Sequence, residues 1–232
     1  MFVTDLDDTI YREIDYVYSG YKAIGKILDD EGIMKCNDVV DFLKSSQNTS
    51  RAFDDLAAQL WLTHPGCRFG VEWMLDVYRY HAPSDLKPLP GVIETFEKLK
   101  KAGEKIGIIT DGRSATQRAK FNALGLGEFV SSQNLIISEE IGADKNTSLP
   151  FEIIVSRNPH ESCFVYIGDN PAKDFRWPNR LGWTTVELKD GLKTNIHSQD
   201  IDVPDDYQAR YIVDRYDEVI PIWENFMEKV KD

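Results

Sequence analysis

The sequence predicts an α/β fold: a mainly parallel, Rossmann-like sheet with helices on both faces, and an inserted all-helical domain. Two patterns indicate it. After Pro90, short apolar runs typical of buried strands alternate with stretches of helical periodicity, and such alternation favours a parallel sheet. Between Ser19 and Tyr80 the pattern is helical throughout, without a convincing strand. A helical stretch in this position predicts an insert between the first strand and the rest of the sheet.

The first strand is the apolar start of the chain, Met1-Phe2-Val3, and the insert is predicted to cover residues 14–85. Four apolar stripes in the insert have the spacings of three and four residues that indicate amphipathic helices. They are Tyr21, Ile24 and Leu28; Val39, Phe42 and Leu43; Phe53, Leu56, Leu60 and Trp61; and Val71, Met74, Leu75 and Tyr78. The end of the insert is marked by turn residues in Pro83-Ser84-Asp85 and Pro88-Leu89-Pro90-Gly91. The core domain is therefore predicted to comprise residues 1–13 and 86–232.

Strands and helices alternate through the second part of the core. The predicted strands are residues 106–110, 135–137, 163–167, 183–188 and 211–213. Helices are expected from Gly91 to Gly103, over 114–124 and over 149–155, and the chain finishes with an amphipathic helix bearing Val219, Ile222, Trp223 and Phe226. Each apolar run is short enough for a buried strand.

Composition excludes several classes of partner. The 232-residue chain has a formal net charge of −12, so we expect neither a nucleic-acid partner nor an anionic membrane surface, both of which repel a broadly acidic protein. No apolar stretch approaches the ~20 residues that span a bilayer. The three cysteines are odd in number and lack metal-site spacing, which is typical of a reducing compartment. We expect a cytoplasmic protein.

Polar side chains follow three of the predicted strands. Asp5 and Asp7 follow the first, Thr110 closes the second with Asp111 and Gly112 after it, and Gly168-Asp169 follows a third. Open α/β sheets bind ligands at this carboxyl edge. Two neighbouring carboxylates repel each other unless a cation or a shared proton intervenes, so the pattern favours a site for a hard cation. The alternative for Asp5 and Asp7 alone is a solvated acidic turn.

These segments, together with a lysine before the helix at 149–155, resemble the haloacid dehalogenase superfamily of hydrolases, most of which are Mg²⁺-dependent phosphatases. The four motifs occur in the family's order. They are Asp5, Asp7 and Thr9; Thr110; Lys145; and Gly168, Asp169 and Asp174. One departure is that the family lysine is usually followed by proline, whereas Asn146 follows Lys145. The resemblance covers the core and is looser over the insert, which occupies the position of the superfamily's helical cap.

The resemblance implies a role for each motif residue. Asp5 is expected to be the nucleophile that forms an aspartyl-phosphate, and Asp7 the general acid and then the base. Thr110 and the backbone N–H groups of Asp111 and Gly112 are expected to bind phosphate, as at the N-terminus of a helix. Lys145 is expected to neutralise the nucleophile and the transferring group. For Thr110, the alternative is a cap on the helix beginning at Ser114.

Mg²⁺ is the expected cofactor because it prefers oxygen ligands. The ligands implied are the carboxylates of Asp5 and Asp169 and the backbone carbonyl of Asp7. Asp174 is expected to be a further ligand, or else an acceptor for Lys145, and the alternative is an acid near a helix dipole. Arg12, Arg113 and Asn170 flank the motifs and are candidates for substrate binding, although flanking position alone also fits ordinary surface residues.

The predicted activity is hydrolysis of a small phosphorylated metabolite, of the sugar, polyol or nucleotide monophosphate class. Two alternatives stay open. A phosphomutase would use the same aspartyl-phosphate, and a receiver-like signalling protein would hold a phosphorylated aspartate without turnover. Receivers, however, are much shorter and have no helical insert between that aspartate and the threonine. A dehalogenase is disfavoured because that chemistry needs no acid at the position of Asp7.

Overall fold

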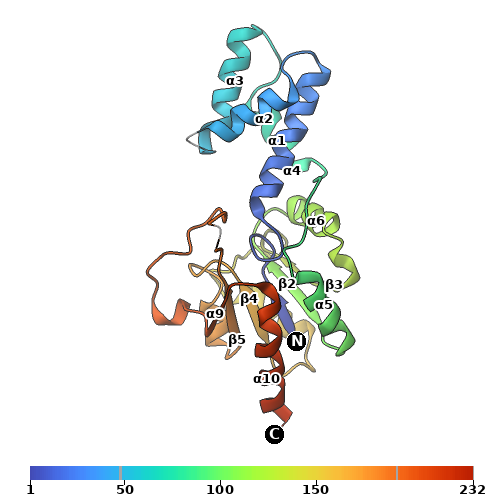
Figure 1. The fold of residues 1–232 in the computed structure, drawn as a ribbon, viewed down its shortest axis with the longest axis vertical. Helices are drawn as coiled ribbons and strands as arrows, with labels where there is room; N and C mark the ends of the chain where they lie inside the picture. The colour runs from blue at the N-terminus through green and yellow to red at the C-terminus, as the bar shows by residue number, and fades with distance from the viewer. Residues whose placement is uncertain (47–48, 192, 232) are drawn as a thin grey trace. The chain divides into compact units, whose positions relative to one another are not determined.

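The computed structural model describes residues 1–46, 49–191 and 193–231. The chain forms two compact units (Figure 1). The core unit comprises Met1–Ile14 and Leu86–Asp232, and the insert unit comprises Asp15–Asp85.

A six-stranded sheet, in which every strand pair is parallel, forms the centre of the core unit. The strand order is β3-β2-β1-β4-β5-β6. The strands are β1 (Phe2–Thr4), β2 (Ile106–Thr110), β3 (Val130–Ile137), β4 (Val165–Gly168), β5 (Thr184–Leu188) and β6 (Tyr211–Val213). The predicted fold class is therefore confirmed. β3 begins five residues before the predicted strand because its first half is polar: Ser131, Ser132 and Gln133 are exposed on this edge strand.

Helices connect these strands. Those of the core are α5 (Val92–Lys101), α6 (Ser114–Ala123), α7 (Ser138–Ile141), α8 (Leu149–Arg157), α9 (Arg176–Arg180) and α10 (Val219–Lys231). Short 3₁₀ turns are η2 (Leu126–Glu128), η3 (Asp205–Tyr207) and η4 (Tyr216–Glu218).

Apolar side chains cover the sheet on both faces, because alternate residues of a strand point to opposite sides. On one face, Val3 of β1 belongs to a buried cluster with Phe151 and Ile154 of α8. On the other, the ring of Phe2 meets that of Tyr216, with centroids 6.4 Å apart, and Tyr216 meets Phe96 of α5 at 6.0 Å. The short strand β1 is therefore buried on both sides.

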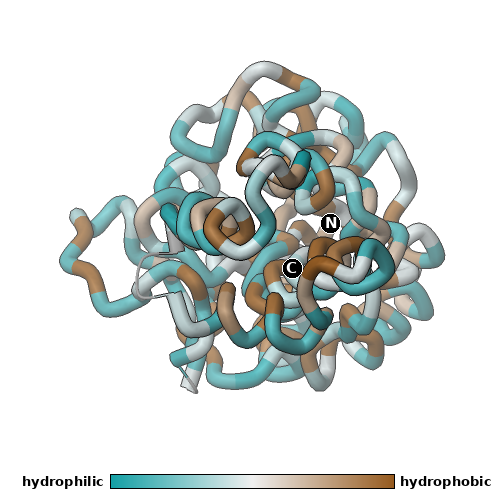
Figure 2. The backbone as a smooth tube through the Cα atoms, turned by 90° about the horizontal axis from the view of Figure 1, so that it is seen from above, coloured by the Kyte–Doolittle hydropathy of each residue, from teal (hydrophilic) through white to brown (hydrophobic). Residues whose placement is uncertain are grey.

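The insert unit is helical, with α1 (Glu13–Asp30), α2 (Cys36–Ser45), η1 (Thr49–Arg51), α3 (Ala52–Thr63) and α4 (Val71–Tyr80). Members of all four predicted stripes are buried in one apolar cluster, among them Ile24, Leu43, Leu56 and Met74. Hydrophobic and hydrophilic residues alternate along the helices (Figure 2). One residue was placed wrongly: Trp61 is 64% exposed, because it lies about 100° around the helix from the buried Leu60. None of the helices in the described ranges has the length and apolar character needed to cross a membrane.

The position of β1 determines where the site lies. From β1 the chain continues to β2 and β3 on one side, and later to β4, β5 and β6 on the other. The strand order thus changes direction at β1, and crevices at such a switch point, outside the carboxyl ends of the strands, are where open α/β sheets bind ligands. Asp5 follows β1 directly, Thr110 ends β2, and Asp169 follows β4.

Candidate active site

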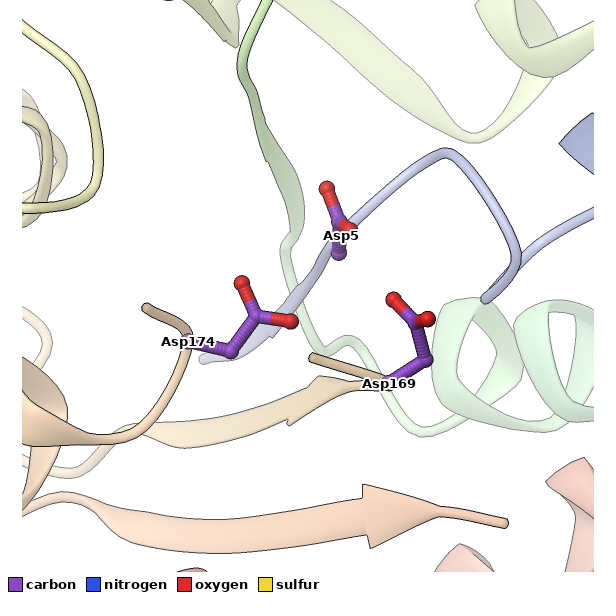
Figure 3. A group of neighbouring side chains, drawn as sticks. All are labelled: Asp5, Asp169 and Asp174. Atoms are coloured by element: carbon purple, nitrogen blue, oxygen red, sulfur yellow. The ribbon is translucent and has the colours of Figure 1, made fainter. Parts of the chain in front are cut away.

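Three buried carboxylates meet at the switch point. They belong to Asp5, Asp169 and Asp174, and one oxygen of each lies within 4.8 Å of the others (Figure 3). Asp5 follows β1, Asp169 follows β4, and Asp174 comes from the turn between β4 and α9. Asp5 and Asp169, which are 164 positions apart in the chain, are thereby brought to one point.

Gly168, the last residue of β4, allows Asp174 to reach this cluster. A Cβ atom on Gly168 would lie 2.5 Å from Asp174 Oδ2, which is too close for any other residue type. The backbone N–H of Asn170 donates to the same oxygen at 2.9 Å, so the Asp174 carboxylate is hydrogen-bonded to the first residues of the turn that carries it. The glycine before Asp169 is therefore required by the packing of Asp174.

Lys145 is fully buried between two of the carboxylates. Its Nζ lies 2.8 Å from Asp5 Oδ1 and 2.5 Å from Asp174 Oδ1. The lysine precedes α8, and its backbone N–H donates to Asp111 Oδ1 at 3.1 Å, which fixes the loop against the end of β2. Although burial opposes its charge, Asp174 and Asp5 raise the pKa of Lys145, so it stays an ammonium. Asp174 is thus both a member of the cluster and the partner of Lys145.

The cluster carries more negative charge than Lys145 balances. Burial, together with the charges of Asp174 and Asp7, raises the pKa of Asp5 to about 7 despite the nearby Lys145. Burial and the charges of Asp174, Asp5 and Asp8 raise the pKa of Asp169 well above its usual value. A set of buried carboxylate oxygens with excess negative charge has the donor chemistry that a hard divalent cation such as Mg²⁺ requires. The residues present therefore fit the expected cofactor.

The side chain of Asp7 lies apart from this set. Its Oδ1 accepts hydrogen bonds from Lys120 Nζ at 2.7 Å and from the Tyr11 hydroxyl at 2.5 Å, and its Oδ2 accepts one from Gln117 Nε2 at 2.7 Å. Burial opposes ionisation, but Lys120 and these hydrogen bonds hold the pKa of Asp7 below its usual value. The side chain of Asp7 is thus committed to Lys120, Tyr11 and Gln117.

Gln117 and Lys120 were missed at the sequence level. Both lie on α6, three residues apart and so on one face of the helix that follows Thr110. Gln117 Nε2 also donates to the Thr110 hydroxyl oxygen at 2.5 Å. The sequence signal that could have indicated them is their three-residue spacing, which places both on one face of the helix that follows Thr110.

Of the two predicted phosphate-binding N–H groups after Thr110, that of Gly112 has an intramolecular partner. The Gly112 N–H donates to Ser138 Oγ at 2.9 Å. The Asp111 carboxylate accepts from Lys173 Nζ at 3.1 Å, in addition to the Lys145 N–H. Lys173, from the turn before Asp174, is a second basic residue that the sequence patterns did not single out.

A cavity of about 100 Å³ opens over the cluster. Its described lining residues are Asp5, Asp7, Asp8, Glu13, Thr110, Asp111, Asp169, Asn170, Lys173 and His197. Of the three candidate substrate-binding residues, only Asn170 is among them. Arg12 instead lines a separate, larger cavity of about 750 Å³, and Arg113 is exposed at the start of α6.

Glu13 and His197 are further lining residues that sequence patterns did not indicate. Glu13 begins α1, and burial together with the charge of Asp7 raises its pKa to about 7. His197 comes from the irregular segment between β5 and β6, where no periodicity marks a direction for the side chain.

A comparison with models of protein families tests the family resemblance that the motifs indicated. The model of the haloacid dehalogenase-like hydrolases matches residues 2–187. The chain belongs to this family. The resemblance read from the motifs, and with it the hydrolase class, is therefore confirmed.

Several haloacid dehalogenase-like proteins are similar to the chain. A glyceraldehyde 3-phosphate phosphatase of Methanocaldococcus jannaschii is 29% identical over 231 residues, with 95% of each chain covered. An enzyme of the same name from Methanopyrus kandleri is 38% identical over 124 residues, and that match spans about half of each protein, 52%. The HAD hydrolase YfnB of Bacillus subtilis, solved bound to magnesium, shares the fold with a TM-score of 0.60 and 19% identity over 96% of this chain and 97% of that chain.

Proposed function

We propose that this hydrolase removes phosphate from a small phosphorylated metabolite through a Mg²⁺-dependent reaction with an aspartyl-phosphate intermediate on Asp5. The observation that carries the proposal is the placement of Asp5. It follows the switch-point strand, lies 2.8 Å from Lys145, and shares the buried cluster with Asp169 and Asp174. The names of the curated relatives support phosphate esters as substrates.

In the first step, a carboxylate oxygen of Asp5 attacks phosphorus, and the bond from phosphorus to the leaving-group oxygen breaks. Phosphoryl transfer depends on an aligned nucleophile and on compensation of the charge on the equatorial oxygens. Lys145 supplies fixed positive charge beside the nucleophile. The Thr110 hydroxyl already accepts a hydrogen bond from Gln117, so its proton is directed to another acceptor, for which a phosphate oxygen is suited.

Asp7 transfers the proton in both steps. Protonated, it gives its proton to the departing alkoxide; ionised, it takes a proton from the water that attacks the aspartyl-phosphate. Phosphate then leaves, and the carboxylate of Asp5 is restored. The pairing of Asp7 with Lys120 matches the ionised form that the second step needs. For the first step, Asp7 must be protonated. Its hydrogen bond with Lys120 is then replaced by one to the leaving-group oxygen.

Asp5, Asp169 and the backbone carbonyl of Asp7 would hold Mg²⁺, with Asp174 beside them as the partner of Lys145. When bound, the ion supplies positive charge to the phosphoryl oxygens. Asp5 and Asp169 are the residues whose pKa values are raised by excess negative charge, which is why we assign them as the principal ligands.

The insert unit is proposed to act as a cap that selects the substrate. Its position in the chain is that of the superfamily's helical cap, between β1 and β2. A closed cap would exclude water from the aspartyl-phosphate and add contacts to the leaving group. The Methanocaldococcus jannaschii relative, matched over 95% of its length, is named for glyceraldehyde 3-phosphate, so small sugar phosphates are the first substrates to test.

The test is release of inorganic phosphate from a panel of sugar, polyol and nucleotide monophosphates, with Mg²⁺ and with a chelator. We expect activity only with Mg²⁺. Asp5→Asn should abolish it while the circular dichroism spectrum stays native, and Asp202→Asn, at an exposed core position, should leave it unchanged. Turnover by Asp5→Asn near the wild-type rate would disprove the nucleophile, and isomerisation without phosphate release would indicate a mutase.

A further inference from the structure

The segment that follows β5, of which residues 189–191 and 193–199 are described, has no role in the proposed reaction, yet it reaches Asp169. Asn195 Nδ2 donates to Asp169 Oδ2 at 2.9 Å. Gln199 Nε2 donates to the backbone carbonyl of Asp169 at 2.7 Å and to that of Leu188, the last residue of β5, at 2.8 Å. Two side-chain amides thus contact one residue, one at its carboxylate and one at its backbone.

The two amides are themselves fixed by hydrogen bonds. The backbone N–H of Asp190 donates to Gln199 Oε1 at 2.8 Å, which orients the amide of Gln199 toward Asp169. Asp190 Oδ2 accepts the backbone N–H of Asn195 at 2.7 Å and also that of Thr194. The next N–H along, that of Ile196, donates to Asp8 Oδ2 at 3.0 Å. Asp8 belongs to the loop of the nucleophile, so this segment joins the ends of β1, β4 and β5.

A neutral donor suits this position for an electrostatic reason. One oxygen of Asp169 lies within 4.8 Å of oxygens of Asp5 and Asp174, so like charges surround its carboxylate and only hydrogen bonds hold its orientation. A lysine at position 195 would hold the carboxylate but would compete with a metal ion for it. An amide orients one oxygen, Oδ2, without adding positive charge. The other oxygen, Oδ1, accepts a long hydrogen bond from the Thr9 hydroxyl, at 3.4 Å.

We propose that Asn195 and Gln199 are positioning residues that orient Asp169 for binding Mg²⁺. The inference rests on the proposed function, because it needs Asp169 to be a ligand. Groups that hydrogen-bond to metal ligands determine the orientation of those ligands, and their loss typically costs about 10–100-fold in metal affinity or activity.

The test measures Mg²⁺ binding by titration calorimetry without substrate. We expect Asn195→Ala to raise the dissociation constant at least about tenfold and Gln199→Ala to raise it by a smaller factor. Asn179→Ala is the matched control. Asn179 donates to the backbone carbonyls of Asp206 and Gln208 and also bonds Thr185, so its loss removes amide contacts of the same kind from a part of the core whose hydrogen bonds do not reach Asp169. It should lower the melting temperature and leave the Mg²⁺ affinity within about twofold.

A kinetic measurement separates positioning from general damage. Because the nucleophile and the acid–base residue are intact in Asn195→Ala, saturating Mg²⁺ should restore most of its kcat, while the Mg²⁺ concentration for half-activation rises. Asn195→Leu, of similar volume, should behave in the same way and covers the case in which the alanine variant folds poorly. An unchanged dissociation constant in both Asn195 variants would overturn the inference while leaving the proposed function intact. Absence of Mg²⁺ binding by the wild type would overturn both.

Discussion

Lys145 and Asp174 form an ion pair with 2.5 Å between Nζ and Oδ1, and both side chains are fully buried. The same ammonium lies 2.8 Å from Asp5 Oδ1. One lysine therefore compensates two buried carboxylates that follow two neighbouring strands, β1 and β4. Because it pairs with both carboxylates, Lys145 is expected to stabilise the fold as well as to take part in the reaction.

Replacing Lys145 by methionine is expected to destabilise the protein. Removing one partner of a buried ion pair leaves uncompensated charge, at a cost of about 3–5 kcal/mol. Urea unfolding of Lys145→Met at neutral pH would measure the loss. Lys173→Met is the control, since Lys173 also pairs with an aspartate but its side chain is 25% exposed. Equal destabilisation by the two substitutions would mean that the shared position of Lys145 has no special energetic role.

Asp169→Asn and Asp174→Asn are expected to affect different properties. Asp169 has no lysine partner among the described ion pairs, and burial with the charges of Asp174 and Asp5 raises its pKa, so its loss should weaken Mg²⁺ binding at least about tenfold. Asp174→Asn should change Mg²⁺ affinity far less, but should lower stability because Lys145 loses a partner. Calorimetric Mg²⁺ titration and thermal unfolding of both variants would check this. The reverse order in Mg²⁺ affinity would refute the assignment of ligands.

Without metal, stability is expected to fall as the pH rises from 5 to 8. Asp5 and Glu13 have pKa values raised to about 7, and that of Asp169 is raised as well. The folded state therefore binds these protons more tightly than the unfolded state. The stability that these bound protons contribute to the folded state is fully present below the ordinary carboxyl pKa near 4. It is lost as the pH rises past about 7. Asp7 has a lowered pKa, so its contribution to stability is present above about pH 4 and is lost only as the pH falls below that value.

Mg²⁺ should counter this loss, because it takes the place of protons on Asp5 and Asp169. Its addition is expected to raise the melting temperature more at pH 8 than at pH 5. Melting curves at both pH values, with and without Mg²⁺, would measure the effect, and Asp169→Asn should reduce it. A Mg²⁺ effect that does not depend on pH would contradict the raised pKa values.

Asp7→Asn is expected to distinguish the two proton transfers. An activated aryl phosphate has a leaving group that needs no proton, so Asp5 should still be phosphorylated and one equivalent of phenol released in a burst. Hydrolysis of the aspartyl-phosphate, which needs the base, should then be slower by about 10²–10⁴-fold. With an alkyl phosphate the burst should be lost. Rapid-quench measurements would show this, with Asp5→Asn as the control that gives no burst with either substrate.

Replacement of the insert unit, residues 15–85, by a short linker tests its proposed role as a cap. Turnover of a small activated aryl phosphate should stay measurable, because every residue assigned to the chemistry lies in the core unit. For the best natural substrate we expect at least a tenfold loss of kcat/KM, about 1.4 kcal/mol of transition-state stabilisation. Equal performance of the shortened protein on both substrates would show that the insert does not select the substrate.

The sequence was sufficient to predict the sheet and the residues at its strand ends. Asp5, Thr110 and Asp169 directly follow or end short apolar runs, and strand ends of a parallel sheet meet at one edge, so local pattern and topology together bring them near one another. Lys145 and Asp174 were recognisable only through the family motifs. A lone lysine before a helix has no distinguishing pattern, and its burial results from contacts far away in the chain.

The remaining site residues could not be predicted because their direction depends on tertiary packing. Lys120 has helical spacing, but spacing alone does not say which face of α6 meets Asp7. Asn195 and Gln199 lie in an irregular segment with no period at all. The partial burial of Glu13 is likewise a tertiary effect: helix α1 starts within the core unit, where an amphipathic pattern would predict an exposed acid at its first position.

The central place of β1 has a consequence for how the protein is made. Phe2 of β1 pairs with Ile106 of β2 on one side and Val165 of β4 on the other. The ribosome synthesises roughly 5–20 residues per second, so the first strand waits roughly 8–30 s for its second neighbour. The helices of residues 15–85 contact one another locally and can form in that interval. The strand that carries the nucleophile is thus translated before the other five strands of the described sheet, yet it gains its second neighbour only after about 160 further residues have been synthesised.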